Sequence, residues 1–133
     1  MKVRAQRSPA EVGKRTRNRP EQALQRAVFQ HIDARSARGA FCLHVPNGGK
    51  RSKVEAAILQ GLGVRAGVPD VLAVKAGRLC ALELKSERGR LSEAQRKTIA
   101  ALKAAGAIVA VAGTLDDAIF HLERWGILRG RMQ

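Results

Sequence analysis

Two short apolar runs joined by a turn constrain the fold of this chain more than any other feature of its sequence. Residues 71–74 and 79–84 are rich in Val, Leu and Ala, and the residues between them include Gly77. Such runs around a short turn predict two antiparallel β-strands. Whether the turn is counted as two residues or four, Val74 lies opposite Leu79. The chain must therefore build its fold around a β-hairpin of defined register.

This register places two acidic residues against each other. Counting outward from the turn, Asp70 lies opposite Glu83. Opposed residues of an antiparallel pair lie about 4.5–5.5 Å apart at Cβ, and two like charges so placed destabilise a sheet. A divalent cation such as Mg²⁺ would neutralise them, because it binds one or two carboxylates together with substrate phosphate oxygens. Lys85, two residues beyond Glu83, projects from the same face.

Taken singly, each half of this pattern has an ordinary structural explanation. An isolated Pro-Asp is usually a turn, and an isolated Glu-x-Lys is usually a solvated strand face. Because Asp70, Glu83 and Lys85 fall in register, they indicate instead a metal-dependent site that hydrolyses phosphodiester bonds.

The charge of the chain favours a polyanionic partner. The 133 residues carry a formal net charge of +14, and residues 1–20 hold seven Lys or Arg against one acidic residue. The rest of the chain still holds 18 basic against 10 acidic residues, so the excess is not confined to one end. Nucleic acid is the expected partner, although a basic protein can also bind acidic lipid or simply be soluble.

Length and composition predict one domain behind a basic arm. With 45% hydrophobic residues, the chain can supply one compact core, which we place in residues 20–133. Residues 1–19 have almost no large apolar side chains and are predicted to form a disordered basic arm, for which the alternative is a tail without function. Because no apolar run approaches the length of a membrane span or a secretory signal, we expect a cytoplasmic protein without a membrane partner. Cys42 and Cys80 lie in apolar runs and are expected to be buried thiols.

Helix-start signals and apolar runs place the remaining elements. Helices are predicted after four such signals, which are Pro20, Ser52, Ser92 and Thr114. Further strands are predicted over 41–45 and 107–111, and the almost wholly apolar 107–111 strand suits a central position covered on both faces. The resulting order is typical of an α/β fold, with a mixed central sheet flanked by helices.

Several motifs occur in one order along this scaffold. They are Pro20-Glu21 with Gln25, then Pro46-Asn47-Gly48-Gly49-Lys50-Arg51, Gly67-Val68-Pro69-Asp70, Glu83-Leu84-Lys85 and Gly89-Arg90-Leu91-Ser92-Glu93-Ala94-Gln95. In this combination the sequence resembles the VRR-NUC family of the PD-(D/E)XK nuclease superfamily, over residues 20 to about 125. The resemblance implies a restriction-endonuclease-like core.

The resemblance also implies a Mg²⁺- or Mn²⁺-dependent nuclease acting on DNA. The metal ligands would be Asp70, Glu83, the backbone carbonyl of Leu84 and, directly or through water, Glu21. Lys85 would orient or activate the attacking water and stabilise the charge that develops on the phosphate. Gln95 corresponds to a glutamine that supports the site, and its alternative role is to cap its own helix by reaching back to the preceding serine.

Eight further residues are candidate DNA contacts, namely Gln25, Asn47, Gly48, Gly49, Lys50, Arg51, Arg88 and Arg90. Glycines let a backbone approach a phosphate closely, although Asn-Gly-Gly is also a common tight turn and the last two arginines also suit a solvated loop. His44, beside the 47–51 loop, could contact substrate, although a lone histidine in a strand is more often structural, and His31 and His121 have no partner at metal-ligand spacing, so none of the three is predicted to be catalytic.

Short free-standing VRR-NUC proteins resemble phage and bacterial enzymes that act as homodimers on branched DNA, especially four-way junctions. The resemblance therefore implies a Holliday-junction-resolvase-like enzyme. The alternatives are a general or nicking endonuclease of the same fold, a non-catalytic basic protein that binds nucleic acid, and a small ribosome-associated basic protein.

Overall fold

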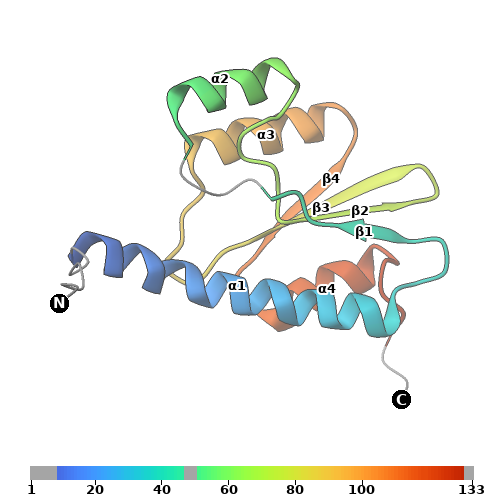
Figure 1. Ribbon diagram of the computed structural model, residues 1–133. Helices are drawn as coiled ribbons and strands as arrows, with labels where there is room; N and C mark the ends of the chain where they lie inside the picture. Colours follow the sequence, from blue (N-terminus) through green and yellow to red (C-terminus); the bar gives the residue numbers. More distant parts are fainter. Residues whose placement is uncertain (1–8, 47–50, 131–133) are drawn as a thin grey trace.

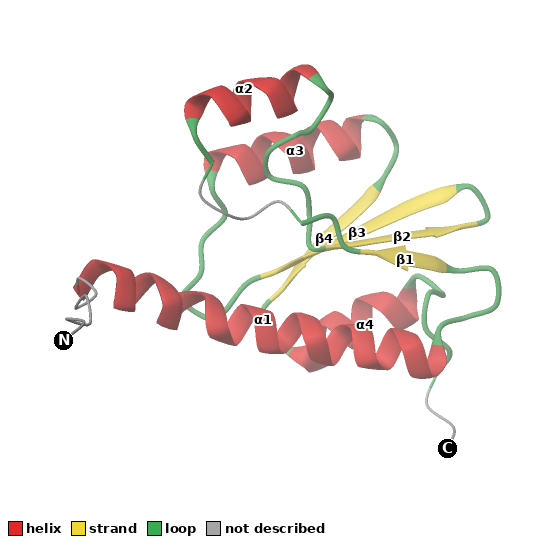
Figure 2. Cartoon of the chain, in the orientation of Figure 1, coloured by secondary structure: helices red, strands yellow, loops and turns green. Residues whose placement is uncertain are grey.

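The computed structural model describes residues 9–46 and 51–130, which form a four-stranded sheet with helices on both sides (Figures 1 and 2). The strands are β1 (Phe41–Leu43), β2 (Val71–Lys75), β3 (Arg78–Leu84) and β4 (Ile108–Ala112), and they lie in that spatial order. β1, β2 and β3 pair antiparallel, whereas β3 and β4 pair parallel. The predicted α/β fold with a mixed sheet is confirmed.

The helices are α1 (Pro9–Arg35), α2 (Lys53–Gly61), α3 (Glu93–Ala104) and α4 (Leu115–Arg124). α1 and α4 lie side by side on one face of the sheet and α3 lies on the other, with α2 beyond α3 (Figure 1). The side chains of Ser52, Ser92 and Thr114 each accept a hydrogen bond from a backbone N–H three residues later. These N-caps begin α2, α3 and α4 where the sequence predicts. Of the helices in the described ranges, none combines the length and hydropathy that crossing a bilayer requires.

The main core lies between the sheet and the α1 and α4 layer. Leu82 and Leu84 of β3 are buried there with Val28 of α1 and Leu122 of α4. Because side chains alternate along a strand, Glu83 points to the opposite face, toward α3. The strand that carries the core thus also carries an acidic residue on its other side.

The predicted hairpin register is confirmed. Val74 pairs with Leu79, and the turn is the two-residue Ala76-Gly77. Both turn residues have positive φ, 52° and 76°, which is the backbone conformation of a type I′ hairpin turn. The last pair at the other end is Val71 with Leu82, so the next position outward brings Asp70 to Glu83.

The prediction for the start of the first helix was wrong. α1 begins at Pro9, so Pro20 lies inside the helix and residues 9–19, predicted to be disordered, are helical. This segment contains Ala, Glu, Lys and Arg, whose helix propensity is high even where their charge is unbalanced. A proline within a helix removes one backbone hydrogen bond and does not by itself require a helix end. The division of the chain at residue 20 into an arm and a nuclease domain stays a prediction.

The predicted position of the last strand was also wrong. β4 lies at the edge of the sheet in the described part of the chain, and Val111 on it is 40% exposed. α3 and α4 both pack against β4, from opposite faces of the sheet. An edge strand covered on both faces has the same apolar composition as a central strand.

The two cysteines only partly follow the prediction. Cys80 is buried but Cys42 is half-buried, and both are free thiols. Burial raises the pKa of both thiols, although the Arg78 charge opposes the shift at Cys80.

Candidate active site

The two opposed carboxylates meet where the hairpin ends. Asp70 directly precedes β2, and its Oδ2 accepts a hydrogen bond of 2.9 Å from the backbone N–H of Leu84. This bond holds the Asp70 carboxylate across the hairpin, beside the neighbouring Glu83. Glu83 is only 2% exposed, and its Oε2 is buried with no hydrogen-bond partner among the described residues. The site therefore contains a buried carboxylate oxygen that needs a partner.

The surroundings of Glu83 favour its neutral form in the absence of a cation. Burial, followed by the neighbouring charge of Asp70, raises the pKa of Glu83 to about 8. The charge of Glu21 adds to this shift, and that of Lys85 opposes it. Lys85 Nζ lies 3.8 Å from Glu83 Oε1, on the same side of the strand as predicted. The pair of carboxylates is thus electrostatically incomplete without added positive charge.

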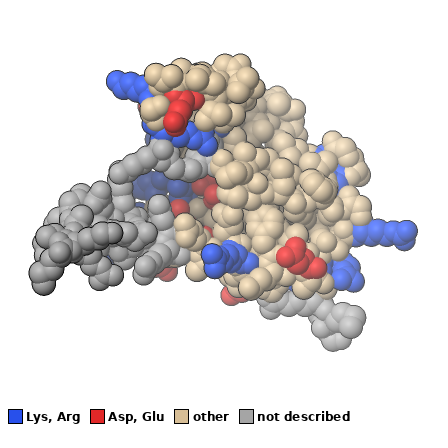
Figure 3. Space-filling view, in the orientation of Figure 1, with Lys and Arg blue, Asp and Glu red and all other residues tan. Residues whose placement is uncertain are grey.

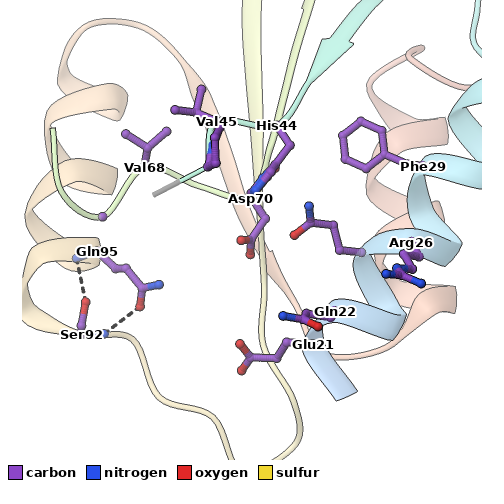
Figure 4. A pocket seen from close by; sticks show the side chains of 13 residues that line it. Glu21, Gln22, Arg26, Phe29, His44, Val45, Val68, Asp70, Ser92 and Gln95 are labelled. Carbon is purple, nitrogen blue, oxygen red and sulfur yellow. Dashed lines mark hydrogen bonds between the residues drawn. The ribbon is translucent and has the colours of Figure 1, made fainter. Parts of the chain in front are cut away.

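Gln95 connects the start of α3 to this pair. The side-chain Oε1 of Gln95 accepts a hydrogen bond of 2.8 Å from the backbone N–H of Ser92, and the backbone N–H of Gln95 donates to Ser92 Oγ at 3.1 Å (Figure 4). Because the amide oxygen is used in this capping box, the amide nitrogen points away from Ser92 and donates to Glu83 Oε1 at 2.9 Å. One side chain thus makes the predicted capping bond and also contacts Glu83, while its role in supporting the active site stays a prediction.

The 66–70 loop is packed tightly against the same helix start. A Cβ on Gly67 would lie 2.4 Å from the carbonyl carbon of Ala94, and the φ of Gly67 is +79°. Thr98 Oγ1 donates a hydrogen bond to the carbonyl oxygen of Ala66. Only glycine fits this close approach, which holds the loop that carries Asp70 against α3.

Glu21 approaches the site from α1. Its Oε1 accepts a hydrogen bond of 3.3 Å from the backbone N–H of Ser86, just beyond β3. Gly89 belongs to the same turn, and a Cβ there would lie 3.1 Å from Glu21 Oε1. Arg88 and Arg90, on either side of this glycine, are exposed. Two predicted DNA-contact residues thus lie beside the turn that Glu21 contacts.

A cleft of about 950 Å³ opens at the carboxylates, between α1 on one side and the end of β1, the 67–70 loop and the start of α3 on the other (Figure 4). Asp70, Glu21, Gln25 and Gln95 all line it. In the space-filling view, basic and acidic side chains lie together in the hollow between the α1 side and the α2 side (Figure 3). Arg51 is exposed just before α2. The other predicted contacts of that loop, Asn47, Gly48, Gly49 and Lys50, lie outside the described residues.

The cleft includes residues that were not among the predicted site residues. His44 Nδ1 lies 2.7 Å from the backbone oxygen of Asp70, which ties the end of β1 to the loop that precedes β2. Gln22, Arg26 and Phe29 line the cleft from α1. Their spacing from Glu21 and Gln25 along one helix was a signal that could have found them, since residues three and four apart share a helix face.

The donor set fits a hard divalent cation. No group of three or more His, Cys, Asp or Glu side chains is placed to hold a metal ion by itself in the described parts of the chain. Mg²⁺ does not need one, because it keeps several waters and uses one or two carboxylates with substrate oxygens. Asp70 and the unpartnered oxygen of Glu83 provide such a pair.

Comparison with protein families decides the relationship of the chain. The family model of the VRR-NUC domain matches residues 19–114, which include Glu21, Asp70, Glu83, Lys85 and Gln95. The chain belongs to the VRR-NUC family. A VRR-NUC domain makes the protein a nuclease of the PD-(D/E)XK type and implies DNA as its substrate, and nucleases of this type generally use divalent metals.

Solved structures of VRR-NUC proteins share the fold. One, titled a VRR_NUC domain protein, is 24% identical to this chain, with a TM-score of 0.66 over 79% of this chain and 86% of that one. A second, titled VRR_NUC domain, is 20% identical with a TM-score of 0.54, over 79% of this chain and 96% of that one. Comparison with curated proteins finds no match. The structural likeness establishes the restriction-endonuclease-like α/β fold.

Proposed function

We propose that this VRR-NUC protein is a Mg²⁺- or Mn²⁺-dependent endonuclease that hydrolyses phosphodiester bonds in branched DNA, like a Holliday junction resolvase. The observation that carries the catalytic part is the opposed pair of Asp70 and Glu83 with its unpartnered buried oxygen. A non-catalytic DNA-binding protein has no need of two opposed acidic residues, one of them buried, because they cost stability when nothing neutralises them.

The chain's own residues would hold the cation and the reacting groups. Asp70, Glu83 and the carbonyl of Leu84 would be direct ligands, and Glu21 would complete the set directly or through water. When bound, such an ion lowers the pKa of a water molecule and offsets charge on the phosphate. The hydrogen bonds from Leu84 to Asp70 and from Gln95 to Glu83 hold both carboxylates in place before substrate arrives.

Lys85 is the residue proposed to act on the reacting atoms. Its side chain is 15% exposed, so the ammonium group lies in a partly desolvated position beside Glu83. A fixed positive charge in such a place stabilises the charge that develops on the phosphate more than a mobile surface lysine can. Lys85 would also orient the attacking water.

The DNA backbone would follow the basic groups around the cleft. Gln25 lines it, Arg88 and Arg90 flank its edge beside Glu21, and Arg51 lies on the loop after β1. The net charge of +14 would add a general attraction for phosphate that falls with added salt.

We further propose a cytoplasmic location.

An exposed apolar stripe supports the homodimer part of the proposal. Val54 and Ile58 of α2 and Leu62, which caps the C-terminus of α2, lie four residues apart, with exposed fractions of 69%, 58% and 77%. α2 has nine residues and none of them is buried. A helix this short is marginal in water by itself, so its apolar face needs a partner. The same face of a second copy would cover it and form a two-fold interface, which places two active sites for paired cuts.

Cleavage of four-way junction, flap, linear duplex and single-stranded DNA with Mg²⁺, Mn²⁺ or EDTA tests the proposal. Paired, metal-dependent cuts in the junction are expected, with Asp70→Ala and Lys85→Ala each lowering the rate by about 10²–10³-fold or more. Lys97→Ala is the control, because that lysine is 77% exposed on α3. Cutting of every substrate alike would remove the junction preference, and binding without cutting under any metal would contradict the nuclease.

A further inference from the structure

The cleft extends well beyond the carboxylates. One part of it has apolar walls, formed by Phe29 of α1, by Val45 and Pro46 at the end of β1, and by Val68. A phosphate backbone is polar throughout and makes little use of apolar walls. The cleft volume of about 950 Å³ is at the upper end of the range for small-ligand pockets, so it has room for a nucleotide as well as for the reacting phosphate.

One face of α1 supplies polar groups along this apolar part. Gln22 lies three and four residues before Gln25 and Arg26, and Phe29 lies four and three residues after them, so the four share one helix face, and all line the cleft. Each glutamine amide has both a donor and an acceptor, as the edge of a nucleobase has. Arg26 is exposed and carries a charge that suits a phosphate on the same strand.

Two rings border the space between these groups. Figure 4 shows His44 between Asp70 and Phe29, with Phe29 on the α1 side and Val45 and Val68 on the other. The His44 ring is held by its contact of 2.7 Å with the backbone oxygen of Asp70. Phe29 packs against the core and also lines the cleft. Aromatic faces beside an apolar wall are the usual surface on which an unstacked base rests.

We propose that this part of the cleft binds one unstacked nucleobase adjacent to the scissile phosphate, with Phe29 as the surface against which the base rests and Gln22 as a contact to its edge. The inference rests on the proposed nuclease function and deepens it. Unstacking a base costs free energy, least where the base is already unpaired. The enzyme therefore cuts fastest where a strand leaves the duplex, as at a branch point.

The test uses 2-aminopurine, a base that fluoresces weakly when stacked and strongly when unstacked. It is placed next to the mapped cut in a junction and in a linear duplex, and wild-type protein is added in EDTA so that the DNA is bound but not cut. The fluorescence should rise on binding, and a duplex with an unpaired nucleotide at that position should be cut faster in Mg²⁺ than its fully paired counterpart.

Variants separate the base contact from general binding. Phe29→Leu should reduce the fluorescence rise and weaken binding by about tenfold, in the range found for loss of one base–aromatic contact. Gln22→Ala, at an exposed position that does not endanger folding, should reduce the rise as well. Phe120→Leu, at a 54% exposed position on α4, is the matched control and should change neither.

The outcomes distinguish this inference from the proposed function. If DNA is bound and cut while the 2-aminopurine stays quenched, or if paired and unpaired positions are cut equally fast, the base site is overturned and the nuclease stands. If Gln22→Ala and Phe29→Leu both leave the rise unchanged, the base lies elsewhere and the assignment is wrong. If no DNA is bound at all, both proposals fail.

Discussion

At the scale of single residues, Glu83 is the one buried charged side chain among the described residues. It is 2% exposed, faces Asp70, and has one oxygen without a hydrogen-bond partner. Burial and the neighbouring charge raise the pKa of Glu83 from the usual 4.5 to about 8. A residue that destabilises its own fold unless a cation is present is typical of a binding site rather than of a scaffold.

The substitution Glu83→Gln should therefore stabilise the metal-free protein at high pH. In the wild type, the native state binds more protons than the unfolded state between pH 4.5 and about 8, so the free energy of unfolding falls as pH rises through that window. The variant should lose this fall and be more stable above pH 8 by about 1–3 kcal/mol, the usual cost of a buried unsatisfied polar group. Thermal unfolding in EDTA across this range measures the difference.

The control for this pH series is Glu93→Gln, since that carboxylate is 83% exposed and should not change the pH dependence. Added Mg²⁺ should raise the melting temperature of the wild type but not that of Glu83→Gln. Equal pH dependence in the wild type and Glu83→Gln would show that Glu83 is not the residue whose ionisation opposes folding.

At the scale of elements, the hairpin and the start of α3 act as one unit. Gly67 allows the loop before β2 to approach α3, and the Ser92 and Gln95 capping box begins that helix beside Glu83. Each of these features is a local rule of loop or helix formation. Together they place the side-chain amide of Gln95 on α3 against the carboxylate of Glu83 on β3.

Gly67→Ala should destabilise the protein more than Gly63→Ala does. Both glycines have positive φ, +79° and +100°, so alanine at either position costs about 1–2 kcal/mol in backbone strain. Only at Gly67 does the new methyl group also meet backbone atoms, at 2.4 Å, whereas nothing lies within 4 Å at Gly63. Urea unfolding of the two variants compares them directly, and equal losses would contradict the close packing of the loop on α3.

Ser92→Ala and Gln95→Ala should separate the cap from the site. Ser92→Ala removes the Oγ acceptor and should cost about 0.5–2 kcal/mol of stability, while the Ser92 N–H still orients the Gln95 amide. Gln95→Ala also removes the donor to Glu83 and should lower the cleavage rate of folded protein more than Ser92→Ala does. Rates measured well below both melting temperatures make this comparison, and equal rates would limit Gln95 to capping.

The sequence predicts these elements well where a local rule decides and poorly where tertiary neighbours decide. The hairpin register follows from the count of residues around Ala76-Gly77, and the N-caps follow from serine and threonine. The edge position of β4 could not be predicted, because α3 and α4 make both of its faces apolar. The contact of His44 with the Asp70 backbone depends on the pairing of β1 with β2, which no local pattern specifies.

At the scale of the whole molecule, the two faces of the sheet differ. One face carries the main core, and the other carries α3 with the exposed helix α2 beyond it. α1, α4 and the sheet enclose the main core, whereas α2 has no buried residue and exposes its apolar stripe. Within the site, the sequence predicts the carboxylate pair and its lysine, because strand parity is enough to bring them together. The cleft walls come from four separate segments of the chain, so the sequence alone could not predict that these segments meet.

Ile58→Lys should convert the proposed dimer to a monomer. The substitution puts a charge in the middle of the stripe formed with Val54 and Leu62, where a second copy would have to bury it. Light scattering after size-exclusion chromatography measures the mass, and Phe120→Lys on α4 is a control of similar exposure. A wild type that is monomeric at all concentrations would contradict the dimer, and Ile58→Lys staying dimeric would place the interface elsewhere.

The bond from Gln95 to Glu83 has a consequence for how this nuclease can be observed. The Gln95 side chain donates a hydrogen bond to Glu83 and accepts one from the Ser92 backbone N–H. The Gln95 backbone N–H in turn donates to Ser92 Oγ. Any ligand that steadies Glu83 must therefore steady the first turn of α3 as well. Deuterium uptake at the backbone amides of Ser92 and Gln95 should slow when a cation occupies the carboxylate pair. Hydrogen exchange at the start of α3 would therefore report the occupancy of the site without any cleavage of DNA.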